Sequence, residues 1–140
     1  MMRTTLRATL RAATALAMVL AVVGVAWADL TETRIAYTSW QDGVNAIYAV
    51  YPDGTSEGRL GVPGAHNAHP SWSPDGTKMA VMSQRDGNRE IYLMHADGTN
   101  PIRLTDSPGD DVAPAWSPDG AKIAFHSARD GDLEIYVVNV

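Results

Sequence analysis

Cysteine is absent from the 140 residues of this chain. No disulfide can therefore strengthen a small fold, and stability has to come from side-chain packing. The same absence excludes a bacterial lipid anchor on an N-terminal cysteine, so export is expected to yield a soluble protein.

Motifs of catalysis and cofactor binding are also missing. The chain has no G-x-S-x-G nucleophile elbow, no glycine-rich phosphate loop and no dinucleotide fingerprint. His66 and His69 lack a third clustered ligand for a metal, and Asp110-Asp111 lacks the spacing of an EF-hand loop. We therefore expect no enzyme activity, no cofactor and no metal site.

Basic residues are few, with 11 lysines and arginines against 16 aspartates and glutamates. Three of the arginines lie within the first eleven residues, so without this segment 8 basic residues face 16 acidic ones and the net charge falls from -5 to -8. Such a chain is a poor partner for nucleic acid and for anionic membrane surfaces.

The N-terminal segment has the three parts of a secretory signal peptide. Arg3 and Arg7 give a basic start, Ala12 to Ala26 are almost all apolar, and Ala26-Trp27-Ala28 is a small-x-small cleavage site. An uncleaved anchor is the alternative, but the apolar run is shorter than the roughly 20 residues that a membrane span needs. We predict a signal peptide over residues 1–28 and a periplasmic or secreted mature protein.

One segment of the chain occurs twice. The stretch from Trp72 to Tyr92, WSPDGTKMAVMSQRDGNREIY, returns from Trp116 to Tyr136 as WSPDGAKIAFHSARDGDLEIY, with 14 of 21 positions identical and no gap. A more divergent copy lies upstream in the same register of 44 residues. A fixed period of this size is typical of stacked supersecondary units.

Each unit contains short runs of alternating apolar and polar residues between turn dipeptides, which indicates antiparallel strands. Asp-Gly pairs supply residue types that tolerate positive φ at the turns. In the middle copy we expect strands over residues 69–72, 78–83, 90–95 and 102–105. A four-stranded unit of 40 to 45 residues with one tryptophan is typical of a β-propeller blade. The predicted fold class is all-β, a partial β-propeller.

The motif PSWSPDGTKMAVMSQRDGNREIYLMHADGTNPIRLT resembles the propeller repeat of the TolB family, the periplasmic component of the Tol–Pal envelope system. Similar repeats occur in the propellers of prolyl oligopeptidase-type and tricorn-type peptidases. The resemblance covers Arg34 to Val140 and implies a propeller fold. It says less about function, because the same blade serves unrelated functions. It also implies a protein partner in the cell envelope, such as a Pal-like lipoprotein.

The repeat register predicts ten strands, or about two and a half blades. Residues 29–140 are divided into an incomplete blade (33–64), a complete blade (65–108) and a second incomplete blade (109–140). Closed propellers have roughly four to eight blades. Three explanations stay open: a truncated reading frame, several copies that assemble into a homo-oligomeric ring, or an open arc of blades.

Residues that recur in each copy are expected to serve the blade itself. The tryptophans should pack between blades, and the tyrosines should do the same with their hydroxyls satisfied locally. The recurring glutamate and the Arg-Asp-Gly turn indicate an ion pair or a turn cap. The residues of this structural set are Trp72, Pro74, Asp75, Gly76, Asp86, Gly87, Glu90, Tyr92, Trp116, Pro118, Asp119, Gly120, Asp130, Gly131, Glu134 and Tyr136.

Function is more often found where the copies differ, and they differ most in the segments 61–70 and 106–114 between blades. In propellers these segments and the turn between the second and third strands border one mouth of the channel, where partners commonly dock. The predicted rim consists of His66, Asn67, His69, Arg85, Asp110, Asp111 and Arg129.

Three classes of function follow. The first is a non-catalytic exported module that binds an envelope protein. The second is an accessory propeller portion of a peptidase or other hydrolase. The third is a fragment of a longer propeller with no independent activity.

Overall fold

The structure is a computed structural model that describes residues 34–140 except residues 42 and 62, and the predicted signal peptide lies outside this part of the chain. Within it the chain is all-β and contains no helix. The ten strands are β1 (Ile35–Gln41), β2 (Val44–Val50), β3 (Gly58–Leu60), β4 (Asn67–Trp72), β5 (Lys78–Ser83), β6 (Glu90–His95), β7 (Ile102–Arg103), β8 (Asp111–Trp116), β9 (Lys122–Ser127) and β10 (Glu134–Asn139).

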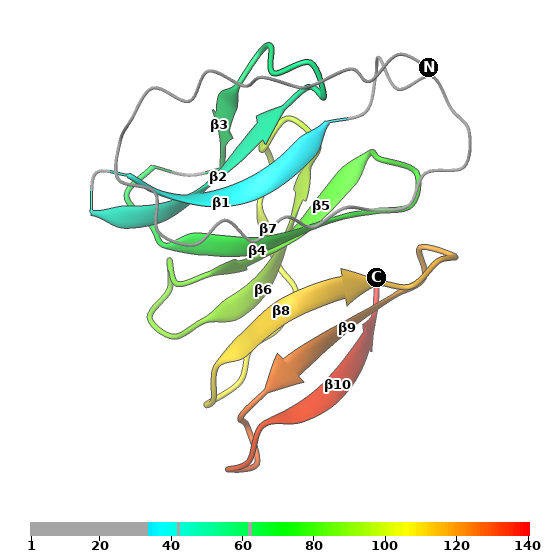
Figure 1. Cartoon of the computed structure of the whole chain (residues 1–140). Coiled ribbons are helices and arrows are strands. Elements are labelled where there is room, and N and C mark those ends of the chain that lie inside the picture. The colour runs from blue at the N-terminus through cyan, green and yellow to red at the C-terminus, as the bar shows by residue number, and fades with distance from the viewer. Residues whose placement is uncertain (1–33, 42, 62) are drawn as a thin grey trace, which may run out of the picture.

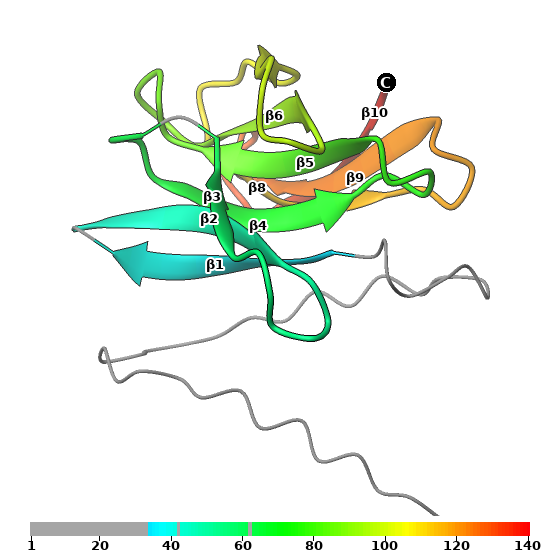
Figure 2. The same ribbon diagram turned by 90° about the horizontal axis from the view of Figure 1, so that it is seen from above.

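The strands form three antiparallel sheets that follow one another along the chain. The first has the order β1-β2-β3, the second β4-β5-β6-β7, and the third β8-β9-β10. Figure 1 shows them fanned from top to bottom, and Figure 2 shows the same stack from above. This arrangement is part of a β-propeller, as the repeat predicted.

The repeat period is visible in the strand register. Ala36 pairs with Ala49, Ala80 with Leu93, and Ala124 with Val137, so each pair lies 44 residues after the previous one. The second and third strands of every unit therefore superimpose in register. Because a slip by one residue would turn the apolar side chains to the other face, the shared register fixes the same buried face in each sheet.

Two predicted strand boundaries shift in the structure. β4 begins at Asn67 rather than at residue 69, because Asn67 pairs with Ser83 and Ala68 with Met82. β7 ends at Arg103 rather than at residue 105. Beyond Arg103, the backbone N–H of Ile91 in β6 donates to the side-chain hydroxyl of Thr105 at 2.9 Å instead of to a backbone carbonyl of β7. The regular pairing of the two strands therefore ends at Arg103.

The first strands of the second and third sheets carry the same bulge. The pairing shifts between Ala68 and Ser71 in β4 and between Val112 and Ala115 in β8. His69 and Ala113, which lie in these bulges, both have a φ of 53°. Non-glycine residues seldom adopt this left-handed conformation, so the bulge is a repeated source of local strain.

The main core lies between the first and second sheets. Ile47 and Ala49 of β2 are buried against Val81 of β5 and Tyr92 of β6, and Trp72 packs against this cluster. Fully burying an aliphatic side chain of this size contributes about 1.5–3 kcal/mol. Trp72 therefore contributes to the packing between the first two sheets.

The second and third sheets are joined by a hydrogen bond as well as by packing. The Trp116 indole Nε1–H donates to the carbonyl oxygen of Ser71 at 3.1 Å. Buried tryptophan N–H groups usually find such an acceptor. Trp116 therefore links the third sheet to the second.

Candidate functional site

The predicted rim is one end of the sheets, where the connections between blades meet the β-turns within blades. The backbone N–H of Gln84 donates to the carbonyl of His66 at 2.9 Å, and that of Ala128 donates to the carbonyl of Asp110 at 3.1 Å. These are equivalent residues 44 positions apart. Each connecting segment is thus attached to the turn of the blade it enters.

Two residues of the predicted rim are buried. Asn67 is 2% exposed and Asp111 is fully buried. The Asp111 carboxylate accepts a hydrogen bond from Arg129 at 2.9 Å, so this buried carboxylate already has its counter-charge. This corrects the expectation that Asn67 and Asp111 form part of an exposed rim.

Arg85 and Arg129 are partly buried and have equivalent internal contacts. The Arg85 guanidinium lies 4.4 Å from the centroid of the Tyr92 ring and donates to Ser83 Oγ at 3.0 Å. Arg129 lies at the same 4.4 Å from Tyr136. Cation–π contacts of this kind stabilise the turn, so these arginines serve the blade.

The hydroxyls of Tyr92 and Tyr136 donate to the aspartates of the nearby Asp-Gly turns. Tyr92 donates to Asp86, and Tyr136 donates to Asp130. Burial and then the hydrogen bond to Asp86 raise the pKa of Tyr92 to about 12. These aspartates therefore anchor the turns rather than face a partner.

Glu90 forms a buried ion pair, but its partner was not found from the sequence. Its carboxylate is fully buried and lies 3.0 Å from Arg103 Nη2. Burial would raise its pKa, but hydrogen bonds from the Ser107 N–H, Thr105 Oγ1, Asn88 Nδ2 and Arg103 outweigh it, and the pKa of Glu90 is lowered. The equivalent Glu134 is exposed.

Of the other predicted rim residues, His69 is exposed, and His66 and Asp110 are partly exposed. His69 is exposed beside β8, and partial burial of its imidazole, followed by the charge of Arg89, lowers its pKa. Arg89 Nη1 lies 3.4 Å from Asp110 Oδ2, and their side chains are 51% and 45% exposed. This is a surface ion pair available to a partner.

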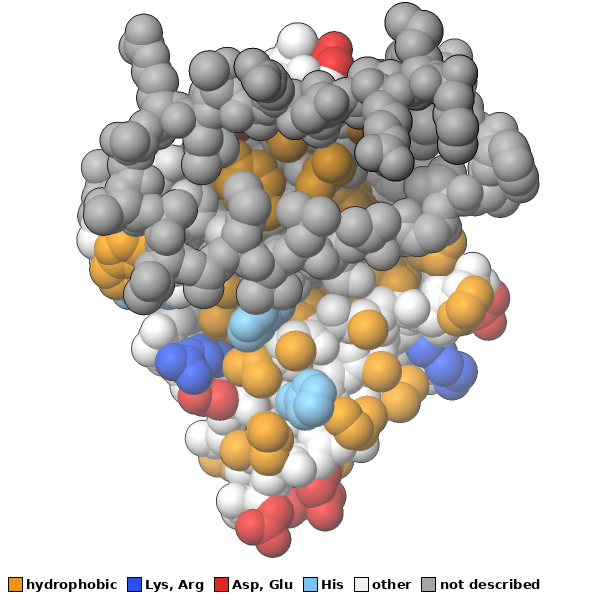
Figure 3. All heavy atoms as spheres, viewed as in Figure 1, with side chains coloured by type: hydrophobic (Ala, Val, Ile, Leu, Met, Phe, Trp, Pro, Cys, Tyr) orange, Lys and Arg blue, Asp and Glu red, His pale blue; other side chains and the backbone are white. Residues whose placement is uncertain are grey.

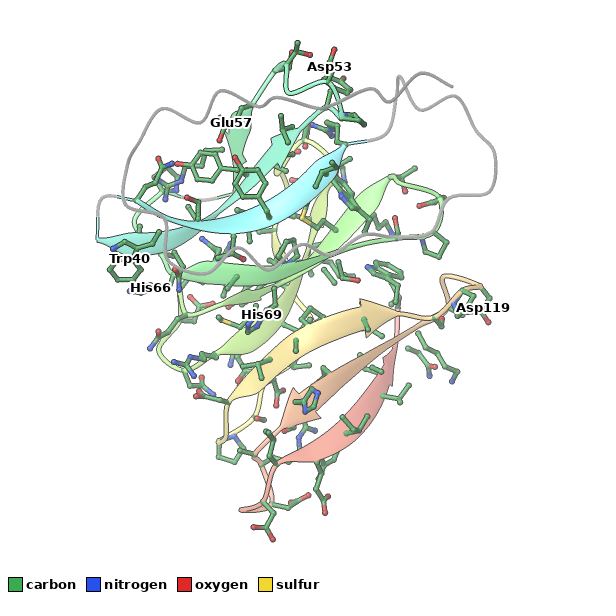
Figure 4. All side chains as sticks on the ribbon, in the orientation of Figure 1. Trp40, Asp53, Glu57, His66, His69 and Asp119 are labelled. Atoms are coloured by element: carbon green, nitrogen blue, oxygen red, sulfur yellow. The ribbon has the colours of Figure 1, made fainter. Side chains whose placement is uncertain are left out.

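Trp40 was missed by the sequence analysis. It is 60% exposed at the end of β1, and its ring lies 5.8 Å from that of His66, tilted by 33°. Figure 4 shows the two side by side at one edge of the molecule. His66 is held in place because its Nδ1 accepts the backbone N–H of Asn45 at 3.2 Å. The signal that could have found Trp40 is that it breaks the tryptophan spacing of the repeat.

We define the observed rim as Trp40, His66, His69, Arg89 and Asp110. It combines one exposed aromatic ring, two histidines and one ion pair. On the face in front in Figure 3, histidine and hydrophobic side chains mix, with charged side chains at the margins. The arrangement suits contact with a protein surface.

The opposite end of the sheets carries the Ser-Pro-Asp-Gly turns. Ser73 Oγ donates to Asp75 Oδ1 at 2.6 Å, and Ser117 Oγ donates to Asp119 Oδ1 at 2.5 Å. These hydrogen bonds are the largest cause of the lowered pKa of both aspartates. Both aspartates thus hold the backbone and side chains of their own turns.

Among the residues that the structure describes, no three histidine, aspartate or glutamate side chains are grouped so that they could hold a metal ion. The same part of the chain contains no helix that is long and apolar enough to span a bilayer.

Comparisons with solved structures show the same architecture. The chain is 27% identical to a putative TolB from Agrobacterium tumefaciens, with a TM-score of 0.75 over 89% of this chain and 46% of that one. It is 31% identical to TolB from Acinetobacter baumannii, with a TM-score of 0.67 over 76% of this chain and 27% of that one. The tricorn protease, at 17% identity and a TM-score of 0.58 over 76% of this chain and 11% of that one, shares the fold.

This chain spans less than half the length of each of these structures. No curated protein matches it. The family model of the TolB beta propeller domain matches residues 17–140. By this match, and by the propeller-type sheets described above, the chain belongs to the TolB β-propeller domain family.

Proposed function

We propose that this chain is a non-catalytic, exported protein-binding module of the bacterial cell envelope, and that its partner docks on the observed rim. The proposal combines the surface chemistry of the rim with membership of the TolB β-propeller domain family. The partner is an envelope protein, and a Pal-like lipoprotein is the first candidate because of the family resemblance. The location is the periplasm.

The exposed Trp40 carries the proposal. A large aromatic side chain that is 60% exposed at the end of a strand leaves its apolar surface in water. Tryptophan and arginine are enriched among the residues that contribute most to protein–protein binding. Trp40 beside His66, with Arg89 on the same rim, therefore has the composition of a binding centre with a polar border.

Rigid attachment of the rim also supports binding. Asn88 Nδ2 donates to the carbonyls of Ser107 and Gly109 at 2.9 and 3.0 Å, which attaches the β7–β8 connection to the β5–β6 turn. The backbone N–H of Arg89 donates to Asp110 Oδ1 at 3.0 Å. A surface that is already ordered loses little conformational entropy when a partner docks.

The test is affinity capture from a periplasmic extract with the exported chain and with its Trp40→Ala variant. A hot-spot aromatic residue at the centre of an interface is worth 2 kcal/mol or more, so the variant should lose at least about 30-fold in affinity for the captured partner. The matched control is Asp53→Ala, which changes an exposed turn residue away from the rim, as Figure 4 shows. Equal affinity of Trp40→Ala and the unsubstituted chain would contradict the proposal.

A further inference from the structure

A second surface is the free edge of β1 around Ala36, four residues before the rim residue Trp40 on the same strand. Within the described residues β1 pairs with β2 alone, whereas the equivalent strand β5 pairs with β4 on one side and β6 on the other. Figure 1 shows β1 in cyan at one edge of the first sheet. A strand edge of this kind presents backbone groups that another strand can pair with.

The Trp72 indole N–H lacks the hydrogen-bond acceptor that the equivalent Trp116 has. The equivalent Trp116 packs on the second sheet and donates its Nε1–H to the carbonyl of Ser71 in β4, at 3.1 Å. Trp72 packs on the first sheet in the same way, but its buried Nε1 has no hydrogen-bond partner in the described part of the chain. A buried polar group without a partner is unfavourable, so an acceptor at this position would be favoured.

The β4–β5 pair gives the geometry that would satisfy Trp72. In that pair Ser71 lies opposite Ala80, and the position of Ala80 in the first sheet is held by Ala36. A strand that runs antiparallel to β1 would therefore place a carbonyl opposite Ala36, where the Trp72 indole N–H can reach it. The backbone of one extended segment would therefore pair with the free edge of β1 and also supply the acceptor for the Trp72 indole N–H.

We propose that the β1 edge binds an extended segment of a partner protein by strand addition, with a backbone carbonyl of the segment accepting the Trp72 indole N–H. Main-chain hydrogen bonds supply the affinity in this mode of recognition, and alternate side chains supply the specificity. Residues 35–39 of β1 carry no charge. In the other two sheets the position beside the equivalent strand is filled by β4, with the sequence NAHPSW, and by β8, with the sequence DVAPAW. The segment that fits is accordingly rich in small and apolar residues.

The probe is a capped synthetic peptide with the sequence of residues 65–73, in which phenylalanine replaces the tryptophan at position 72. Titration of the full chain is followed by NMR on the indole N–H resonances. The peptide should shift the Trp72 indole resonance and slow its hydrogen exchange, while the Trp116 resonance stays in place. A peptide of scrambled sequence should produce neither change.

Two variants separate the indole hydrogen bond from general effects on folding. Trp72→Phe keeps a ring in the core but removes the donor, and it should weaken peptide binding about 3- to 10-fold. Trp116→Phe removes a donor that already has its acceptor, so peptide affinity should be unchanged. Equal affinity of all three proteins would overturn the proposal. So would a Trp72 indole N–H that is as protected in the free chain as that of Trp116, because residues 1–33 of the chain itself would then fill the edge.

The outcome is distinct from that of the proposed function. Arg89→Ala acts on the rim away from β1 and should leave binding of this peptide unchanged, whereas Trp72→Phe acts on the β1 edge and should leave docking on the rim unchanged.

Discussion

Arg103 on the outer strand β7 extends to the fully buried carboxylate of Glu90 on β6, and Nη2 lies 3.0 Å from Oε1. The same nitrogen lies 2.8 Å from Oδ1 of Asp106, whose side chain is 86% exposed. One guanidinium thus joins a buried and an exposed carboxylate. Because a buried charge that loses its partner is far more costly than a surface one, the two ion pairs should differ in energy.

Replacing Arg103 with alanine should lower the free energy of unfolding by about 2–3 kcal/mol, since Glu90 would stay buried without its counter-charge. Asp106→Asn removes only the exposed pair and should cost less than about 0.5 kcal/mol. Urea denaturation followed by tryptophan fluorescence measures both. Similar losses for the two variants would show that burial does not govern this cluster.

Acid stability should depend on Glu90. Its pKa in the folded chain is lowered, so its ionised form contributes stability above the unfolded value of about 4.3, and this contribution is lost as the pH falls through the folded pKa. Glu90→Gln should therefore flatten the decline in stability below about pH 4.3. Glu134→Gln, at the equivalent but exposed position, is the control and should leave the slope unchanged. The measurement is urea denaturation at a series of pH values.

Strain at the bulge of β8 can be relieved by glycine. Ala113 has a φ of 53°, where a side chain is disfavoured, so Ala113→Gly should stabilise the chain by about 0.5–1 kcal/mol. Ala115 lies two residues later in the same strand without positive φ. Ala115→Gly should therefore destabilise by about 0.5–1 kcal/mol. The melting temperatures of the two variants should move in opposite directions, and a fall in both would contradict the assignment of strain.

Two equivalent turn glycines should differ in their tolerance of alanine. Gly54 and Gly98 share a φ of 83°, but an added Cβ at Gly54 meets nothing within 4 Å, whereas at Gly98 it would lie 2.6 Å from the backbone nitrogen of Gly61. Both substitutions carry the penalty of positive φ, and Gly98→Ala adds a clash with backbone. We expect Gly98→Ala to be the more destabilising by about 1–3 kcal/mol in thermal unfolding. Equal destabilisation by the two substitutions would mean that the turn at Gly98 does not contact Gly61 in solution.

The fold could be predicted from the sequence because each level of the repeat points to the same unit. Trp72 and Trp116, the alternating strands and the Asp-Gly turns recur at 44 residues, and local preference agrees with packing throughout. The partner of Glu90 could not be predicted in this way. Arg103 lies thirteen residues further on, on the next strand, so only the pairing of β6 with β7 brings the two together.

The rim was predicted in part. Position in the loops between blades identified His66, His69 and Asp110, but loop position does not determine burial. Asp111 lies directly after Asp110 and faces inward, because successive side chains at the start of β8 point to opposite faces. Trp40 could not be found in this way, because it lies near the end of strand β1 and not in a loop between blades.

Hydrogen-exchange mapping of the chain with and without its captured partner locates the docking surface. We expect slower backbone exchange at the rim end, in residues 40–45, 63–69, 84–89 and 106–110, and unchanged exchange in the opposite turns, residues 51–57, 73–78, 95–100 and 117–122. Protection of the opposite turns with an unchanged rim would contradict this expectation.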